Sequence, residues 1–476
     1  MFKFYIPDKF IILRYKIMKI TKGKKISNRL DFGPVFFVTP NPNRAVGLEK
    51  GIKNYHIICS HYLDIIEYLR EDGVPVLCLN DDMIKNTGKL LENEKVLNYI
   101  KAQSKGEVPN VVTFKPSPKI EKICELNKFN HAGNDWRLNR KFENKINFVD
   151  ISGKLNIPNA GSRVVKLGDF EVVKDYFEGG AKCVIQLPRG FSGNSTFLLG
   201  SREDFDRLAE KLGGRSVKIA KYLAGETFTI NGCVAKGDVF VGKPIYQITG
   251  FTDFNGNNMG TSGNDYAYSV TLGPEARKKI FDYTKKIGKY MSREGYRGIF
   301  GLDFIVPENG EVNLIEINPR LVGSIPVYTK LQIESGEFPF LAMHLGEFIY
   351  GKNSAGSRPE QSYTVWRKED NFSASQLILR NTGKRPLILD KAVSSGIYKL
   401  EKRKLVFSGK GYFIGARLGR DEILIQCASQ GSLINPDMEY ANIQTSYGIM
   451  KEKGFDEGFS DIIGLVQDRI KLKETA

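Results

Sequence analysis

One short segment, residues 301–321, constrains the fold of this chain more than any other. Its sequence, GLDFIVPENGEVNLIEINPRL, consists of two apolar runs separated by the turn tetrapeptide PENG at 307–310. Apolar runs on both sides of such a turn predict two antiparallel strands, over residues 301–306 and 311–318. An ordinary half-exposed hairpin is the simplest interpretation of this pattern.

Three oxygen-bearing side chains interrupt the apolar pattern of this hairpin. Glu316 and Asn318 are two residues apart and therefore share one face of the second strand. Asp303 lies opposite them if the strands pair in the expected register. Two carboxylates and an amide suit Mg²⁺, which completes its shell with water and phosphate oxygens. Arg320 could then bind a phosphate, although the strand pattern equally allows polar residues that simply face water.

Length and charge narrow the class of protein. A chain of 476 residues is too long for one compact core, and we expect two to four domains. The 70 Lys and Arg against 54 Asp and Glu give a net charge of +16, which favours anionic partners such as nucleotides, phosphorylated intermediates or acidic carrier proteins. The chain has no RNP-like or zinc-knuckle pattern, so we do not predict that it binds nucleic acid.

Several further classes are excluded by missing patterns. The six cysteines are spaced singly without a CxxC pair, which predicts free thiols. The four histidines show no metal spacing and are interpreted as structural. No apolar run approaches the length of a membrane span, and charged residues interrupt the N-terminal apolar stretch, so we expect a cytoplasmic protein. The absence of GxSxG, HExxH and GxxxxGK[ST] motifs removes three large enzyme classes.

The order of apolar segments predicts a mixed α/β chain. Buried strands at 34–40 and 74–80, with a helix at 61–72 between them, indicate a βαβ sheet. The middle of the chain alternates helices with strands that end in glycine turns, and the tail is rich in strands and closes with a helix. The expected domains are 1–130, 131–355 and 356–476. The predicted elements of the middle and tail are a helix and extended segment at 139–161, strands at 217–250, a helix at 274–295, a linker at 351–362 and a helix at 459–474.

The hairpin resembles the metal-binding hairpin of the ATP-grasp superfamily, in which a carboxylate in a GxDF-like strand precedes Glu-apolar-Asn-Pro-Arg. The resemblance implies that Asp303, Glu316 and Asn318 hold two Mg²⁺ ions, or Mn²⁺ in their place, on the phosphates of ATP. It assigns to Arg320 the stabilisation of the transferred phosphoryl group. The implied architecture is α/β (α+β), with an N-terminal βαβ pre-ATP-grasp domain, the ATP-grasp domain and a small β-rich C-terminal domain.

Other segments resemble the superfamily in the same order along the chain. ENKINFVDISGKLNIPNAG is similar to the segment in which a lysine reaches the ATP phosphates, which implicates Lys145. VIQLPRGFSGNSTF resembles the glycine-rich loop over the phosphates. The residues implicated there are Gly190, Ser192, Gly193, Asn194 and Ser195. Many relatives carry a second lysine on the strand before that loop, where this chain has Gln186, and Arg189 could compensate for it.

The adenine and acceptor sites are implied by two further segments. KIAKYLAGETFTINGCV is similar to the adenine hinge, which assigns Lys221, Tyr222 and Leu223 to the base and Glu226 to the ribose. The Gly- and Asn-rich segment that follows, of the kind that lines an acceptor pocket, contains Gln247, Asn264 and Asp265. A plain surface loop is an equal interpretation for the last two.

The resemblance implies a ligase that joins a small-molecule carboxylate to an amine, such as an amino acid or peptide ligase, through an acyl phosphate with release of ADP and phosphate. A variant would load an amino acid onto the thiol of an acidic acyl carrier protein. A small-molecule kinase or a non-catalytic nucleotide-binding protein on the same fold would also fit the resemblance. A homodimer is compatible with each of these.

Overall fold

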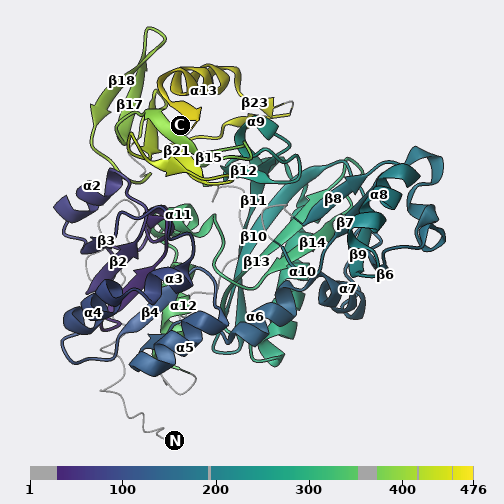
Figure 1. The fold of residues 1–476 in the computed structure, drawn as a ribbon, viewed down its shortest axis with the longest axis horizontal. Helices are drawn as coiled ribbons and strands as arrows, with labels where there is room; N and C mark the ends of the chain where they lie inside the picture. The colour runs from purple at the N-terminus through teal and green to yellow at the C-terminus, as the bar shows by residue number, and fades with distance from the viewer. Residues whose placement is uncertain (1–28, 191–194, 352–371, 415–417, 453, 475–476) are drawn as a thin grey trace, which may run out of the picture.

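The fold is a mixed α/β arrangement in which one parallel sheet stands beside large antiparallel sheets (Figure 1). The structure is a computed structural model that describes residues 29–190, 195–351, 372–414, 418–452 and 454–474. It confirms the predicted fold class. Within these residues no helix is long and apolar enough to span a membrane, and all six cysteines are free thiols.

The N-terminal part is a parallel five-stranded sheet in the order β3-β2-β1-β4-β5. Its central strand, β1, is fully buried because helices cover both faces, as its unbroken VFFV run predicts. The predicted βαβ unit is confirmed. A further strand, β2, runs between β1 and β3. The strands are β1 Val35–Val38, β2 Tyr55–Cys59, β3 Val76–Cys78, β4 Asn110–Thr113 and β5 Asn130–His131, and the helices are α2 Ile65–Glu71, α3 Thr87–Leu91, α4 Glu94–Gln103 and α5 Pro118–Asn127.

The central element is an antiparallel sheet of ten strands in the order β14-β13-β10-β11-β12-β15-β21-β19-β17-β18. Strand β15 pairs with β12, so strands of the tail continue the sheet begun by the middle of the chain. The division at 355–356 lies in a segment outside the described residues and stays a prediction. The strands are β10 Glu226–Ala235, β11 Asp238–Thr249, β12 Thr261–Asp265, β13 Gly298–Val306, β14 Asn313–Asn318, β15 Ser375–Arg380, β17 Gly396–Glu401, β18 Lys404–Gly409, β19 Glu422–Cys427 and β21 Glu439–Thr445.

Helices pack along this large sheet, and small β elements complete the tail. The long amphipathic helix α10 packs on β10 and β11 through its buried stripe, as its sequence predicts. The helices are α9 Thr252–Asn255, α10 Pro274–Arg293, α11 Ile325–Ser335, α12 Phe340–Ile349 and α13 Glu457–Arg469. The small sheets consist of β16 Leu387–Lys391, β20 Leu433–Ile434 and β24 Lys471–Glu474, and of β22 Met450–Lys451 and β23 Gly454–Phe455.

A separate antiparallel sheet of four strands, in the order β6-β9-β7-β8, faces the hairpin β13–β14 on the side away from the N-terminal sheet (Figure 1). One face of this sheet packs on helix α8 around a small apolar core. The other face is directed toward helix α7 and strand β14. Helix α7 contacts both β9 and β14. The elements are β6 Arg163–Lys166, β7 Cys183–Gln186, β8 Thr196–Leu199, β9 Ser216–Lys221, α7 Lys145–Lys154 and α8 Arg202–Leu212.

The segment predicted as one helix at the start of 139–161 is two helices, α6 Trp136–Glu143 and α7 Lys145–Lys154. Asn144 separates them because its backbone is extended, with φ −68° and ψ 119°, and its side chain accepts a hydrogen bond from the N–H of Ile146. Asparagine is among the most favourable residues for this capping role. The prediction of a single helix is therefore wrong, and the break makes Lys145 the first residue of α7.

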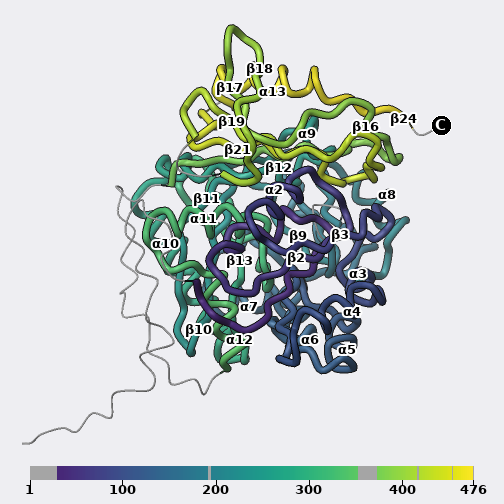
Figure 2. Tube along the Cα trace, turned by 90° about the vertical axis from the view of Figure 1, so that its left-hand side faces the viewer, coloured from purple at the N-terminus to yellow at the C-terminus, as the bar shows by residue number. Residues whose placement is uncertain are grey.

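The tail forms one end of the central sheet and lies across one end of the N-terminal sheet (Figures 1 and 2). Polar contacts hold it there. The hydroxyl of Tyr68 donates to the carbonyl of Ser395 at 2.9 Å, and the hydroxyl of Tyr412 donates to Glu49 at 3.0 Å. These contacts join the N-terminal part to the tail, and both tyrosine rings pack in or against the main apolar core, which contains residues of all three parts of the chain.

The histidines are confirmed as structural where both ring nitrogens are satisfied. His344 in α12 lies between the residue that follows β5 and the start of β13. Its Nε2 donates to the carbonyl of Ala132 at 3.0 Å, and its Nδ1 accepts the N–H of Ile299 at 3.1 Å. This arrangement requires the neutral ring, because protonation would set an N–H against an N–H. Burial accordingly lowers the pKa of His344 to about 4. His61 differs, since its Nε2 is buried without a partner in the described chain.

His344 should make the fold sensitive to acid. A pKa lowered from 6.5 in the unfolded chain to about 4 in the fold stabilises the protein above pH 6.5. That contribution should be lost as the pH falls toward 4, at about 1.4 kcal/mol per pH unit. The variant His344→Gln keeps a donor and an acceptor but cannot titrate. In urea unfolding, the stability gap between wild type and this variant should therefore shrink from pH 7.5 to pH 4.5. A constant gap would contradict the assignment.

Candidate active site

The hairpin pairs in the predicted register. Asp303 in β13 stands directly opposite Glu316 in β14, and Gly301 stands opposite Asn318. A β-bulge follows between Asp303 and Phe304. Paired residues project from the same face of a sheet, so the carboxylates and the amide meet on one side of the hairpin.

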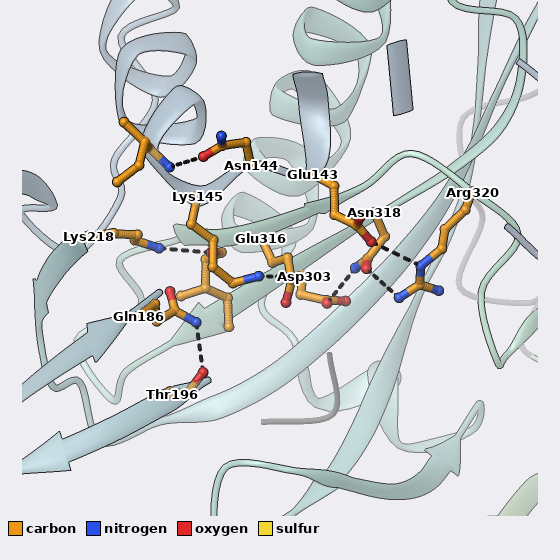
Figure 3. A network of polar contacts seen from close by, with 12 residues as sticks. Glu143, Asn144, Lys145, Gln186, Thr196, Lys218, Asp303, Glu316, Asn318 and Arg320 are labelled. Atoms are coloured by element: carbon orange, nitrogen blue, oxygen red, sulfur yellow. Dashed lines mark hydrogen bonds and ion pairs between the residues drawn. The ribbon is translucent and has the colours of Figure 1, made fainter. Parts of the chain in front are cut away.

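A hydrogen-bond network joins these side chains (Figure 3). Asn318 Nδ2 donates to Asp303 Oδ2 at 2.8 Å. Gln247 Nε2 from β11 also donates to Asp303 Oδ1, at 3.1 Å. Lys145 reaches from the start of α7 and donates to Glu316 Oε1 at 3.0 Å. Side chains from α7 and β11 thus converge on the hairpin, and both Lys145 and Gln247 are candidates from the sequence.

The oxygen donors of this network fit Mg²⁺. Two carboxylates and one amide are hard ligands of the kind that Mg²⁺ binds while it keeps water and phosphate oxygens in its remaining positions. Among the described residues, neither this site nor any other contains a cluster of three or more His, Cys, Asp or Glu side chains that could hold a metal ion. Asn318 directs its amide nitrogen toward Asp303, so the amide has to turn over for its oxygen to join the carboxylates.

Burial and neighbouring charge tune the carboxylate of Asp303. Desolvation raises its pKa to about 6, and the negative charge of Glu316 acts in the same direction. Hydrogen bonds from Thr229 and Asn318 and the charge of Arg320 oppose this rise in pKa. A cation placed between the two carboxylates would relieve their repulsion.

Arg320 is held from several sides. Its guanidinium donates to Asn318 Oδ1 at 2.9 Å and to the carbonyl of Leu321 at 3.0 Å. Its Nε lies 3.7 Å from Glu143, which also receives two hydrogen bonds from Lys115. Lys115 follows β4, so the N-terminal sheet helps to position Arg320. The sequence reasoning missed Glu143 and Lys115, because only the fold brings β4 to the end of α6.

The base of the glycine-rich loop is fixed close to Lys145. The N–H of Lys145 donates to the carbonyl of Pro188 at 3.2 Å. Gly190 packs against Ser195, where a Cβ on Gly190 would lie 1.6 Å from the Ser195 hydroxyl oxygen, so only glycine fits without rearrangement. The loop residues Ser192, Gly193 and Asn194 lie outside the described residues, and Arg189 is exposed.

The side chain of Gln186 is hydrogen-bonded within its own sheet. Its amide donates to Thr196 at 3.2 Å across the β7–β8 pair. Directly opposite Gln186 on the other neighbouring strand, β9, stands Lys218. Lys218 is almost fully buried, donates to the carbonyl of Ile315 at 3.0 Å and lies 4.0 Å from the centre of the Phe148 ring. Burial lowers its pKa to about 7. The sequence reasoning missed it, although a lysine between Val and Ile in a buried strand is an unusual residue.

The predicted hinge leaves the sheet at the end of β9. The N–H of Lys221 donates to the carbonyl of Ala160, and that of Tyr222 donates to the carbonyl of Lys182. The N–H of Tyr222 is therefore already engaged, while its side chain is 40% exposed. Leu223 follows it in a partly exposed position, and Glu226 begins β10 opposite Val306.

The candidates for the acceptor site take different roles. Gln247 contacts the metal-ligand candidate Asp303. Asn264 and Asp265 belong to the buried strand β12, so the interpretation as a surface loop is wrong for both. Asp265 accepts four backbone N–H groups, those of Ala267, Tyr268, Ile449 and Met450. Its carboxylate is thus committed to joining β12 to the tail.

No family model matches this chain. Among curated proteins, it is 21% identical over 313 residues to the large chain of an arginine-specific carbamoyl phosphate synthase from Halalkalibacterium halodurans, a match that covers 64% of this chain and 28% of the relative. It is 29% identical over 149 residues to the [butirosin acyl-carrier protein]–L-glutamate ligase of Niallia circulans, covering 30% of this chain and 34% of the relative. The matches thus span about a third or less of these relatives.

Solved structures match over nearly the whole chain. Biotin carboxylase from Campylobacter jejuni superposes with a TM-score of 0.57 at 13% identity, covering 93% of this chain and 92% of the other. L-amino acid ligase from Bacillus licheniformis superposes with a TM-score of 0.55 at 14% identity, covering 94% and 99%. The fold shared with these proteins is the ATP-grasp fold. This chain has the ATP-grasp fold, as its hairpin motif predicts.

Asp265 should prove structural. In the variant Asp265→Asn an amide NH₂ would face two of the four backbone donors, and the free energy of unfolding should fall by about 2–4 kcal/mol. The exposed carboxylate of Asp253 in α9 supplies the control, since Asp253→Asn should change stability by less than about 0.5 kcal/mol. Chemical denaturation of both variants measures the difference. Equal stabilities would contradict the structural role.

Proposed function

We propose that the protein is an ATP-dependent ligase that joins a carboxylate to an amine and releases ADP and phosphate. The observation that carries this proposal is the network in which Lys145, Asp303, Glu316, Asn318 and Arg320 meet on one face of the hairpin. Metal ligands and two cations on one face form the arrangement that a transferring phosphoryl group requires. The shared fold with a biotin carboxylase and an L-amino acid ligase supports it.

In this proposal the nucleotide lies between the four-stranded sheet and the hairpin. The adenine would contact residues 221–223, and the ribose would contact Glu226. The phosphates would reach the loop base at Gly190 and Ser195, and Lys145 would bind them. Mg²⁺, when held by Asp303, Glu316 and Asn318, would neutralise part of the phosphate charge.

The chemistry then has two steps. A carboxylate oxygen of the substrate attacks the γ-phosphorus, the bond from that phosphorus to the bridging oxygen breaks, and ADP leaves with the electron pair. The amine next attacks the carbonyl carbon of the acyl phosphate, inorganic phosphate leaves, and the nitrogen loses a proton to give the amide. Lys145 and Arg320 hold the oxygens that carry negative charge in both steps.

A second candidate acceptor is the thiol of an acyl carrier protein. The match to a relative named as an acyl-carrier-protein–L-glutamate ligase favours it, and so does a net charge of +16, which would attract an acidic carrier. The first step would be unchanged. The thiolate would replace the amine in the second step and form a thioester.

The test is to measure ADP and phosphate release from Mg-ATP with a panel of amino acids and small carboxylates, with and without amines or an acyl carrier protein. We expect both products in equal amounts and dependent on a carboxylate. Glu316→Gln should lower the rate at least about a hundredfold, because one of the two carboxylate ligands loses its charge. Glu311→Gln, an exposed position on the same hairpin, is the matched control and should behave as wild type.

The products of this assay separate the candidate functions. ADP without free phosphate would show transfer of the phosphoryl group to a hydroxyl and would contradict the ligase. Binding of Mg-ATP without any turnover, unaffected by Glu316→Gln, would indicate a non-catalytic nucleotide-binding protein. A thioester formed only with the carrier protein would select the second acceptor.

A further inference from the structure

We propose that Lys218 is the second basic side chain for the nucleotide phosphates and supplies the charge that Gln186 lacks. This inference rests on the proposed function, because it assigns a further residue to the same site. It begins from strand pairing. Gln186 in β7 and Lys218 in β9 are directly paired antiparallel neighbours, so their side chains leave the sheet on the same face.

That face is the one that meets the hairpin. The residues adjacent to the pair along each strand, Ile185 on β7 and Val217 and Ile219 on β9, are buried in the apolar core on the opposite face. The alternation of side chains along a strand therefore directs Lys218 away from that core and toward β14. Its ammonium is hydrogen-bonded to the carbonyl of Ile315 in β14 (Figure 3).

The two lysines meet consecutive residues of β14. Lys218 donates to the carbonyl of Ile315, and Lys145 donates to the carboxylate of Glu316. Lys145, which is proposed to bind the phosphates, is itself buried. The burial of Lys218 is therefore no argument against the same role. Both ammonium groups thus gather at the same point of the hairpin, one from α7 and the other from β9.

The positive charge of Lys218 is only partly balanced by the protein: the charge of Glu316 favours the ammonium form, but Lys218 makes no ion pair among the described residues. Lys145 has Glu316 as its ion-pair partner, whereas the hydrogen-bond acceptor of Lys218 among the described residues is a neutral carbonyl. Burying an ammonium without a paired anion is costly, and a second lysine nearby increases the cost. A polyphosphate placed between the two sheets would supply the missing negative charge to both lysines. An ammonium carries three N–H groups, so contact with Ile315 and with phosphate oxygens is compatible.

The experiment moves the positive charge from position 218 in β9 to the paired position 186 in β7. Mg-ADP and adenosine binding are measured by calorimetry for wild type, Lys218→Met and the double variant Lys218→Met/Gln186→Lys. We expect Lys218→Met to weaken Mg-ADP binding at least about tenfold, as loss of one charged contact does, and to leave adenosine binding unchanged. The double variant should recover most of the Mg-ADP affinity. Lys166→Met removes an exposed lysine from the same sheet and should bind as wild type.

The outcomes decide between the role of Lys218 and the function on which it rests. Equal Mg-ADP affinity of wild type and Lys218→Met would overturn the role of Lys218 and leave the ligase proposal intact. Loss of both adenosine and Mg-ADP binding that Gln186→Lys does not restore would show a structural role and would also overturn it. Failure of wild type to bind Mg-ADP would instead overturn the proposed function on which the inference rests.

Discussion

The pairing of β13 with β14 is the constraint on which the rest of the site depends. It sets Asp303 opposite Glu316 and brings Asn318 beside them, and it does so within a contiguous hairpin. A shift of one residue would direct one of the two strands' polar side chains to the apolar face. Because β13 also pairs with β10 along nine residues, the hairpin is held to the central sheet and its register is fixed from both sides.

Around this hairpin the protein concentrates charge that it only partly balances. Asp303 and Glu316 lie together, with the pKa of Asp303 raised to about 6, while Lys145 and Arg320 approach from opposite sides. Charged groups of both signs that face one another, with a carboxylate of raised pKa among them, are typical of a site prepared for a charged ligand. The network that links Arg320 through Glu143 to Lys115 extends this site to the end of β4 in the N-terminal sheet.

The sequence predicted the parts of the fold in which local pattern and burial agree. The VFFV run of β1, the two apolar runs of the hairpin and the apolar stripe of α10 each agree with the burial of the element that they form. It failed where a single residue overrides the pattern, as Asn144 does by capping α7. It also failed for Asp265, since a polar segment reads as a loop until its carboxylate is seen to accept four backbone N–H groups from two separated segments.

The motif from Asp303 to Arg320 predicted the register of the hairpin from residue order, because the spacing that matters there is local to two adjacent strands, and its resemblance to the ATP-grasp hairpin predicted the fold. Only the tertiary structure decided which residues surround it. Lys218 stands opposite Gln186, Gln247 reaches Asp303, and Lys115 reaches Glu143 through pairings between segments far apart in the chain. Such pairings follow from the packing of whole sheets, and no local periodicity of the sequence contains them.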